Sequence, residues 1–174
     1  MGEESVITSE RRFRRATMAD WPTMLKIYEH ARKLMASNGN PTQWGDKFPR
    51  EEVVRDDVES QRTVLLVDTV DGEERVLAQF ALCPGIDPTY VNIDGAWLDD
   101  DPYVTIHRIA SSGLAKGAAK DCINWCIEHY GNVRADTHPN NKAMQHVLES
   151  NGFARCGLIQ LLDRPFDTTR IAYQ

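Results

Sequence analysis

Two features of the sequence combine residue types that could carry out chemistry, and the first is a histidine in an apolar run. His107 lies within YVTIHRIAS, residues 103–111. Polar side chains are seldom buried without a hydrogen-bonding or functional reason. Because imidazole changes its charge near physiological pH, His107 is a candidate general base. The alternative is a core or interface histidine with satisfied hydrogen bonds, and the sequence leaves both interpretations open.

The second feature is a turn of small residues, SSGLAKGAA, at positions 111–119. Gly113 and Gly117 would let a ligand come close to the backbone, and Ala118 and Ala119 keep bulky side chains away. The helix that follows would offer unpaired N–H groups and a positive dipole end, which favour a pyrophosphate. The pattern is neither a P-loop nor GxGxxG, so simple packing of the turn remains an alternative.

Residues in the irregular segments are further candidates. Asp99, Asp100 and Asp101 end a long excursion and are either solvated or an acidic rim that attracts a cationic amine. Trp44 and Trp97 could each form part of the wall of the site or anchor a loop on the domain. His138 lies in a turn, which explains it more simply than a role in the site does.

These residues must be positioned by an α/β domain with a mixed sheet, because strand-like and helix-like patterns alternate along the chain. Asp71-Gly72 is a hairpin signal between two of the strands. The expected strands are 11–16, 63–70, 75–83, 103–111, 133–137, 153–162 and 168–174. The expected helices are one that Asp20 caps and residues 37–41 end, and those at 50–60, 115–129 and 140–151. The helix at 115–129 would bury Ala118, Cys122, Trp125, Cys126 and His129.

Length and composition indicate one globular domain over residues 1–174, since 41% of the residues are hydrophobic and 26% are charged. No apolar run approaches the roughly 18 residues that a membrane span requires. The first 15 residues contain no apolar stretch that could form a signal-peptide core. We therefore expect a cytoplasmic protein without a membrane partner.

The formal net charge of −6 argues against nucleic-acid binding, which depends on Lys and Arg contacts to phosphates. The basic cluster of Arg11, Arg12, Arg14 and Arg15 is interpreted as the polar edge of the first strand. Cys122 and Cys126 lie four residues apart on a helix without a histidine at metal-binding spacing, so they are expected in the core. No metal is expected.

Two blocks of the sequence resemble the GNAT superfamily of acyl-CoA-dependent N-acetyltransferases. RIAS (108–111) is similar to the apolar-small run of that family, and LAKGAA (114–119) follows at the place of its Q/R-x-x-G-x-G/A signature. DTHPNNKAMQHVLESNGF (136–153) looks like the second block, which opens with Asn and ends in Gly-Phe. The resemblance extends from Phe13 to Tyr173 and implies a GNAT-like single domain, a mixed central sheet flanked by helices, in the order β-α-α-β-β-β-α-β-α-β-β.

The resemblance also implies where acetyl-CoA would bind. The pantetheine arm would lie where the His107 strand and the Val133 strand splay apart. A main-chain N–H near Ile109 or Ala110 would stabilise the developing oxyanion. The Asn141 side chain would contact the coenzyme, or else cap a helix. The implied coenzyme-binding residues are Ile109, Ala110, Ser111, Gly113, Leu114, Ala115, Lys116, Gly117, Ala118, Ala119 and Asn141.

Two positions depart from the family pattern. Leu114 replaces the usual Gln or Arg, so the phosphates would depend on backbone N–H groups and on Lys116. Leu148 replaces the tyrosine that protonates the leaving thiolate in many members, so either no acid is needed or a water serves. A histidine at what looks like the His107 position occurs in a member of the family.

The resemblance therefore implies an acetyl-CoA-dependent N-acetyltransferase with a small-molecule or peptide amine as acceptor. The amine, cationic or polar, would attack the thioester directly in a ternary complex, with His107 as the base, directly or through water. A homodimer is compatible with this interpretation. One alternative is a non-catalytic acyl-CoA-binding sensor or regulatory module of the same fold. The other is an unrelated α/β binding domain whose turn merely packs.

Overall fold

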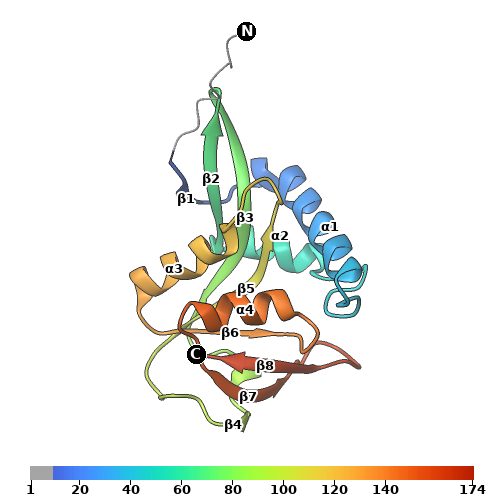
Figure 1. The fold of residues 1–174 in the computed structure, drawn as a ribbon, viewed down its shortest axis with the longest axis vertical. Coiled ribbons are helices and arrows are strands. Elements are labelled where there is room, and N and C mark those ends of the chain that lie inside the picture. The colour runs from blue at the N-terminus through green and yellow to red at the C-terminus, as the bar shows by residue number, and fades with distance from the viewer. Residues whose placement is uncertain (1–9) are drawn as a thin grey trace.

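The computed structural model describes residues 10–174 and contains one eight-stranded mixed sheet in the order β1-β2-β3-β5-β6-β8-β7-β4 (Figure 1). The expectation that the first 15 residues form no signal-peptide core falls mostly outside the described residues. The strands are β1 Arg12–Arg15, β2 Thr63–Val70, β3 Glu73–Pro84, β4 Asp94–Gly95, β5 Val104–Ser111, β6 Val133–Thr137, β7 Arg155–Gln160 and β8 Thr169–Tyr173. The helices are α1 Trp21–Ser37, α2 Glu51–Glu59, α3 Ala118–Tyr130 and α4 Lys142–Ser150, with 3-10 turns η1 Met18–Asp20 and η2 Pro88–Tyr90.

Helices cover both faces of the sheet, so the predicted α/β class with a mixed central sheet is confirmed. α3 and α4 pack on one face through residues such as Cys122, Cys126 and Leu148. α1 and α2 pack on the other through residues such as Met24 and Val54. Figure 1 shows α1 and α2 on the right of β3 and β5, with α3 on the left. Within the part of the chain that the structure describes, no helix is long and apolar enough to cross a membrane.

Three local expectations need correction. Asp20 is the N-cap residue of α1 as expected, but its side chain makes no capping bond to α1. It accepts instead from the Thr17 N–H at 2.8 Å, which completes a capping box around the 3-10 turn η1. The excursion contains a short strand, β4, which pairs with β7 and adds an eighth strand at the edge. On α3, His129 is exposed although we expected it to be buried, and Ile123 is buried although we did not predict it. Two-residue strands and helix faces near a C-terminus have too little periodicity to be predicted.

A β-bulge in β5 lies where this strand moves away from its neighbour β6. The register between β3 and β5 shifts after Gln79, and Arg108 opposite this shift has a φ of +54°. β5 pairs with β6 over only two residues, Val104 and Thr105, and the strands then diverge. In Figure 1, β5 runs vertically while β6 and β8 cross below it. The bulge therefore coincides with an opening between two neighbouring parallel strands.

The bulge also changes which side chains share a face. Regular alternation puts His107 and Ile109 on one side and Ile106 and Arg108 on the other. Instead, Ile106 and Ile109 both contact the core under α3 and α4. Arg108 reaches α2 on the opposite face. One extra residue in a strand shifts every later side chain to the other face, so the regular alternation that a strand at 103–111 implies fails beyond His107.

A buried ion pair holds the bulge in place. The Arg108 guanidinium donates to both carboxylate oxygens of Asp57 on α2, at 2.7 and 3.0 Å, and Asp57 also accepts from Arg62. The Asp57 side chain is 2% exposed. The Tyr28 hydroxyl donates to the Arg108 carbonyl at 3.1 Å. These contacts compensate for a backbone conformation that residues other than glycine seldom adopt.

Asp57→Ala is expected to lower the free energy of unfolding by about 3–5 kcal/mol, because it leaves the Arg108 charge without its buried partner. Urea denaturation measures this change. Asp56→Ala is the control, since Asp56 also pairs with Arg62 but its side chain is 68% exposed. We expect that control to lose at most about 1 kcal/mol. Equal losses in the two variants would contradict the role given to Asp57.

Candidate active site

A cavity of about 440 Å³ lies where β5 and β6 diverge. Elements from distant parts of the chain form its walls. One wall comes from β5, β6, α3 and α4 and includes Ile109, Ile123, Ala135, Met144 and Leu148. The opposite wall comes from the α1–α2 loop, the start of the excursion and the β7–β8 loop, and includes Gln43, Trp44, Phe48, Asp87 and Arg164. The space is large enough for a small ligand to be enclosed by both walls.

His107 lies in this cavity and pairs with a carboxylate that the sequence analysis missed. Its Nε2 is 2.6 Å from Asp87 Oδ2, and the two side chains are 23% and 13% exposed. Burial raises the pKa of Asp87, but the hydrogen bond and charge of His107 outweigh it, so the Asp87 pKa lies below its usual value. No described residue bonds to His107 Nδ1. The imidazole is therefore held through one nitrogen, and the other can accept a proton.

A second polar pair lies beside the first. The buried Tyr90 hydroxyl donates to Asp136 Oδ2 at 2.6 Å, and the Tyr90 ring centroid is 6.1 Å from that of His107. Burial and the nearby Asp136 charge raise the Tyr90 pKa well above its usual value. Asp136 lines the cavity. Asp87 and Tyr90 belong to the segment GIDPTY, in which Asp before Pro signals only a turn, and nothing local links that turn to His107.

The small-residue turn leads into α3 outside the cavity. Gly117 is the N-cap of α3 with a φ of +72° and no side-chain cap, so the first N–H groups of the helix carry no capping side chain. A Cβ at Gly113 would lie 2.8 Å from His30 Nε2. Arg11 donates to the Lys116 carbonyl at 2.7 Å and pairs with Asp121 at 2.5 Å. Open N–H groups beside basic side chains fit a pyrophosphate.

Some of the other predicted coenzyme-binding residues line the cavity, and some do not. Ile109 lines the cavity, while Ala110 is buried and pairs with β3, as does Ser111. Leu114 is 56% exposed, and its apolar side chain offers a ligand no hydrogen bond. Asn141 lines the cavity, caps α4 by accepting from the Met144 N–H, and donates to Gln43. The capping interpretation of Asn141 is confirmed, and its contact with the coenzyme stays a prediction.

The candidates in the irregular segments separate clearly. Trp44 is buried in the cavity wall. Trp97 packs on Tyr90 and anchors the excursion. The acidic residues 99–101 do not line the cavity, because Asp99 bonds to Asn132 at the opposite end of β6. The expected acidic rim beside the site is therefore wrong.

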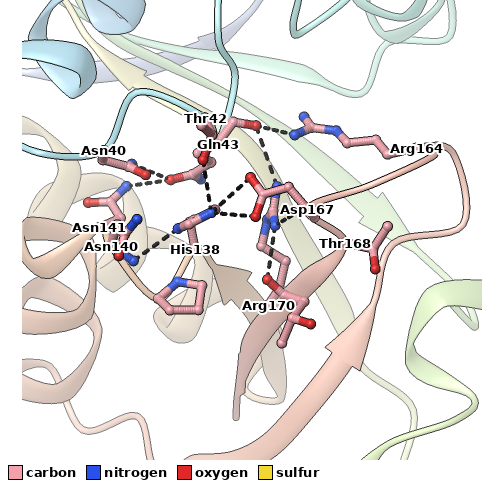
Figure 2. Close-up of polar contacts among 12 residues, drawn as sticks. Asn40, Thr42, Gln43, His138, Asn140, Asn141, Arg164, Asp167, Thr168 and Arg170 are labelled. Atoms are coloured by element: carbon pink, nitrogen blue, oxygen red, sulfur yellow. Dashed lines mark hydrogen bonds and ion pairs between the residues drawn. The ribbon is translucent and has the colours of Figure 1, made fainter.

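His138 has a structural role close to the cavity (Figure 2). The Asn140 N–H donates to His138 Nδ1 at 2.9 Å, so Nε2 carries the proton and donates to Asp167 at 3.0 Å. Gln43 Oε1 accepts from Asn40 and Asn141. These bonds join the α1–α2 loop, the start of α4 and the β7–β8 loop. The simpler interpretation of His138, as a turn residue, is confirmed.

Comparison with solved structures identifies the fold. A GNAT-family acetyltransferase from Streptococcus agalactiae has 28% sequence identity to this chain and a TM-score of 0.81. The match covers 97% of this chain and 96% of that one. The chain has the GNAT acetyltransferase fold. The resemblance to the GNAT superfamily is thereby confirmed.

More distant acetyltransferase structures share the fold alone. A ribosomal-protein-alanine N-acetyltransferase from Brucella melitensis has 18% identity and a TM-score of 0.62, over 93% of this chain and 97% of that one. A Salmonella typhimurium protein, solved with its cofactor acetyl-CoA, has 17% identity and a TM-score of 0.56, over 94% and 91%. No protein-family model and no curated protein sequence matches this chain.

Proposed function

We propose that this protein is an acetyl-CoA-dependent N-acetyltransferase that transfers the acetyl group to a primary amine by direct attack in a ternary complex. The observation that carries the proposal is the His107–Asp87 pair in a cavity at the divergence of β5 and β6. A GNAT fold alone does not specify the reaction. A positioned imidazole with a free nitrogen adds the base that acyl transfer to an amine uses.

The coenzyme would be held by residues on the α3 side of the sheet. The glycine turn and the first N–H groups of α3 would take the pyrophosphate, with Lys116 and Arg11 as nearby cations. The pantetheine arm would pass between β5 and β6 beside Ile109. Acetyl-CoA, when bound, supplies an acyl group on a thioester. The same contacts leave the Asp87 side of the cavity for the acceptor.

The residues of the chain would then act as follows. His107 Nδ1 takes the proton from the attacking amine, directly or through one water, and Asp87 stabilises the protonated ring. The main chain near Ile109 or Ala110 faces the developing oxyanion. Transfer forms a C–N bond and breaks a C–S bond. Leu148 is 1% exposed and offers no proton, so a water would protonate the leaving thiolate.

Acetyl-CoA is expected to stabilise the fold by about 2.7 kcal/mol at 100 times its dissociation constant. A thermal-unfolding titration measures the binding, and release of free thiol with a panel of amines measures turnover. Absence of any thermal shift with acetyl-CoA would contradict the proposal at its first step.

A non-catalytic acyl-CoA-binding module is the second candidate, and Leu148 at the usual place of a tyrosine favours it. In that case acetyl-CoA binds, but no amine in the panel releases thiol faster than buffer does. The proposal also includes that residues 1–174 form one cytoplasmic N-acetyltransferase domain. A homodimer is compatible with it. Among residues 10–174 all four cysteines are free thiols, in keeping with a reducing compartment.

A further inference from the structure

Three arginine side chains meet on the acceptor side of the cavity, and we call Arg50, Arg164 and Arg170 the arginine cluster. The guanidinium carbons of Arg50 and Arg164 lie 5.0 and 3.8 Å from the centroid of the Phe48 ring. Arg164 and Arg170 both donate to the Gln43 carbonyl, as Figure 2 shows. All three residues line the cavity. The cluster therefore brings three positive charges to one end of it.

The charges of this cluster have no carboxylate in direct contact. Among residues 10–174, none of the three guanidinium groups lies within 4.0 Å of a carboxylate oxygen. Arg170 is 2% exposed, and it donates to the backbone carbonyls of Asp167, Thr169 and Gln43. Buried charges are normally paired, so this arrangement is unusual in a free protein.

Arg164 is also incompletely hydrogen-bonded. It donates through Nη1 only, and its Nε is buried without a partner within residues 10–174. Burial lowers the pKa of both Arg164 and Arg170, and the nearby carboxylates of residues 163, 167 and 136 do not restore it. An unpaired buried donor is costly, and a planar guanidinium edge is the group that binds a carboxylate through two parallel hydrogen bonds.

The same cavity also carries negative charge. Asp87 and Asp136 both line it; Asp87 bonds to His107 and to the Thr89 N–H, and Asp136 accepts from Tyr90. A ligand in the cavity thus meets carboxylates and an imidazole as well as guanidinium groups. Charges of both signs match a molecule with an amine and an anionic group.

We propose that the acceptor is an amino carboxylate, a small amine whose carboxylate binds the arginine cluster while its amine faces His107. This inference rests on the proposed acetyltransferase function and names the substrate class for the same site. It replaces the acidic rim at residues 99–101 as the feature that would recognise a cationic or polar amine, because those residues do not line the cavity. The cavity must also admit the thioester end of the coenzyme, so the acceptor is small.

A binding experiment tests the inference without turnover. The probes are linear amino carboxylates from glycine to 6-aminohexanoate, each beside its carboxamide, titrated calorimetrically into protein saturated with coenzyme A. We expect at least one amino carboxylate to bind roughly ten- to a hundredfold more tightly than its carboxamide, because a charged hydrogen-bonded contact is worth that factor. Equal binding of all pairs, or no binding by any, would overturn the inference.

Substitutions then assign the preference to the cluster. Arg164→Gln should reduce the carboxylate-over-carboxamide ratio to near one, and Arg164→Lys should restore it only in part. Arg50→Gln, at an exposed position, serves if Arg164 variants do not fold. Arg12→Gln is the matched control, because Arg12 pairs with Glu74 at the far edge of the sheet. An unchanged ratio in both the Arg164 and the Arg50 variants would overturn the assignment.

Thiol-release rates separate this inference from the function on which it rests. Acetyl-CoA binding with equal rates on amines and amino carboxylates would leave the acetyltransferase standing and reject the carboxylate. Failure of acetyl-CoA to bind would reject the function itself. Tighter binding of O-phosphoethanolamine than of every amino carboxylate would show that the cluster takes a phosphate, which also overturns the proposal.

Discussion

His107→Gln is expected to lower turnover by about 10²–10⁴, the usual contribution of a positioned proton-transfer group. Glutamine keeps much of the size of the side chain and can still bond to Asp87, but it cannot take a proton from the amine. The variant should also lose the acidic limb of the pH–rate profile. Steady-state thiol release across a pH series measures both effects, and calorimetry should give an unchanged affinity for acetyl-CoA.

Two companion variants make this result specific. His129→Gln changes an exposed histidine on α3 whose Nδ1 bonds only to the Trp125 carbonyl, and it should leave the rate unchanged. Asp87→Asn removes the charge that would stabilise the protonated imidazole, so the rate should fall. A folded His107→Gln protein that loses less than about threefold, far below that range, would make His107 structural.

Gly117→Asp is expected to abolish measurable binding of acetyl-CoA. The substitution puts a carboxylate at the start of α3, where the proposed pyrophosphate would lie, and like charges repel each other there. The stabilisation of about 2.7 kcal/mol expected at 100 times the dissociation constant would disappear. Thermal unfolding with and without acetyl-CoA measures the loss.

Gly117→Asn separates charge from backbone strain. Asparagine has nearly the same shape as aspartate and must adopt the same positive φ of +72°, a conformation that it tolerates better than most residues. We expect this neutral variant to keep a clear thermal shift with acetyl-CoA. If both variants lose binding equally, the turn depends on its backbone shape, and the pyrophosphate cradle would not be supported by this pair.

The part of the fold that local patterns determine could be predicted from the sequence. The strand VRADT has the predicted bounds, and the β2–β3 hairpin turns at Asp71-Gly72 as expected. The bulge at Arg108 could not be predicted, because the carboxylate that pairs with Arg108 there lies 51 residues away on α2. Nothing in the run RIAS itself distinguishes a bulged strand from a regular one.

The candidate site shows the same division between local and distant information. His107 and the glycine turn stand out within a few neighbouring residues. Asp87, Tyr90 and the arginine cluster become meaningful only when loops far apart in the sequence meet in one cavity. The acidic run at residues 99–101 is an example, since its charge is obvious in the sequence, but only the structure decides between a solvated loop and an acidic rim beside the site.

The two walls of the cavity come from different stretches of the chain, and this has an evolutionary consequence. The α3-side wall is built from one continuous stretch, from β5 to α4, whereas most of the facing wall comes from three separate loops, with single residues added from α1, α2 and β8. Insertions and exchanges in loops are tolerated more readily than changes in packed elements. Descendants of such a protein can therefore acquire new acceptors by replacing loops while they inherit the proposed coenzyme-binding half intact.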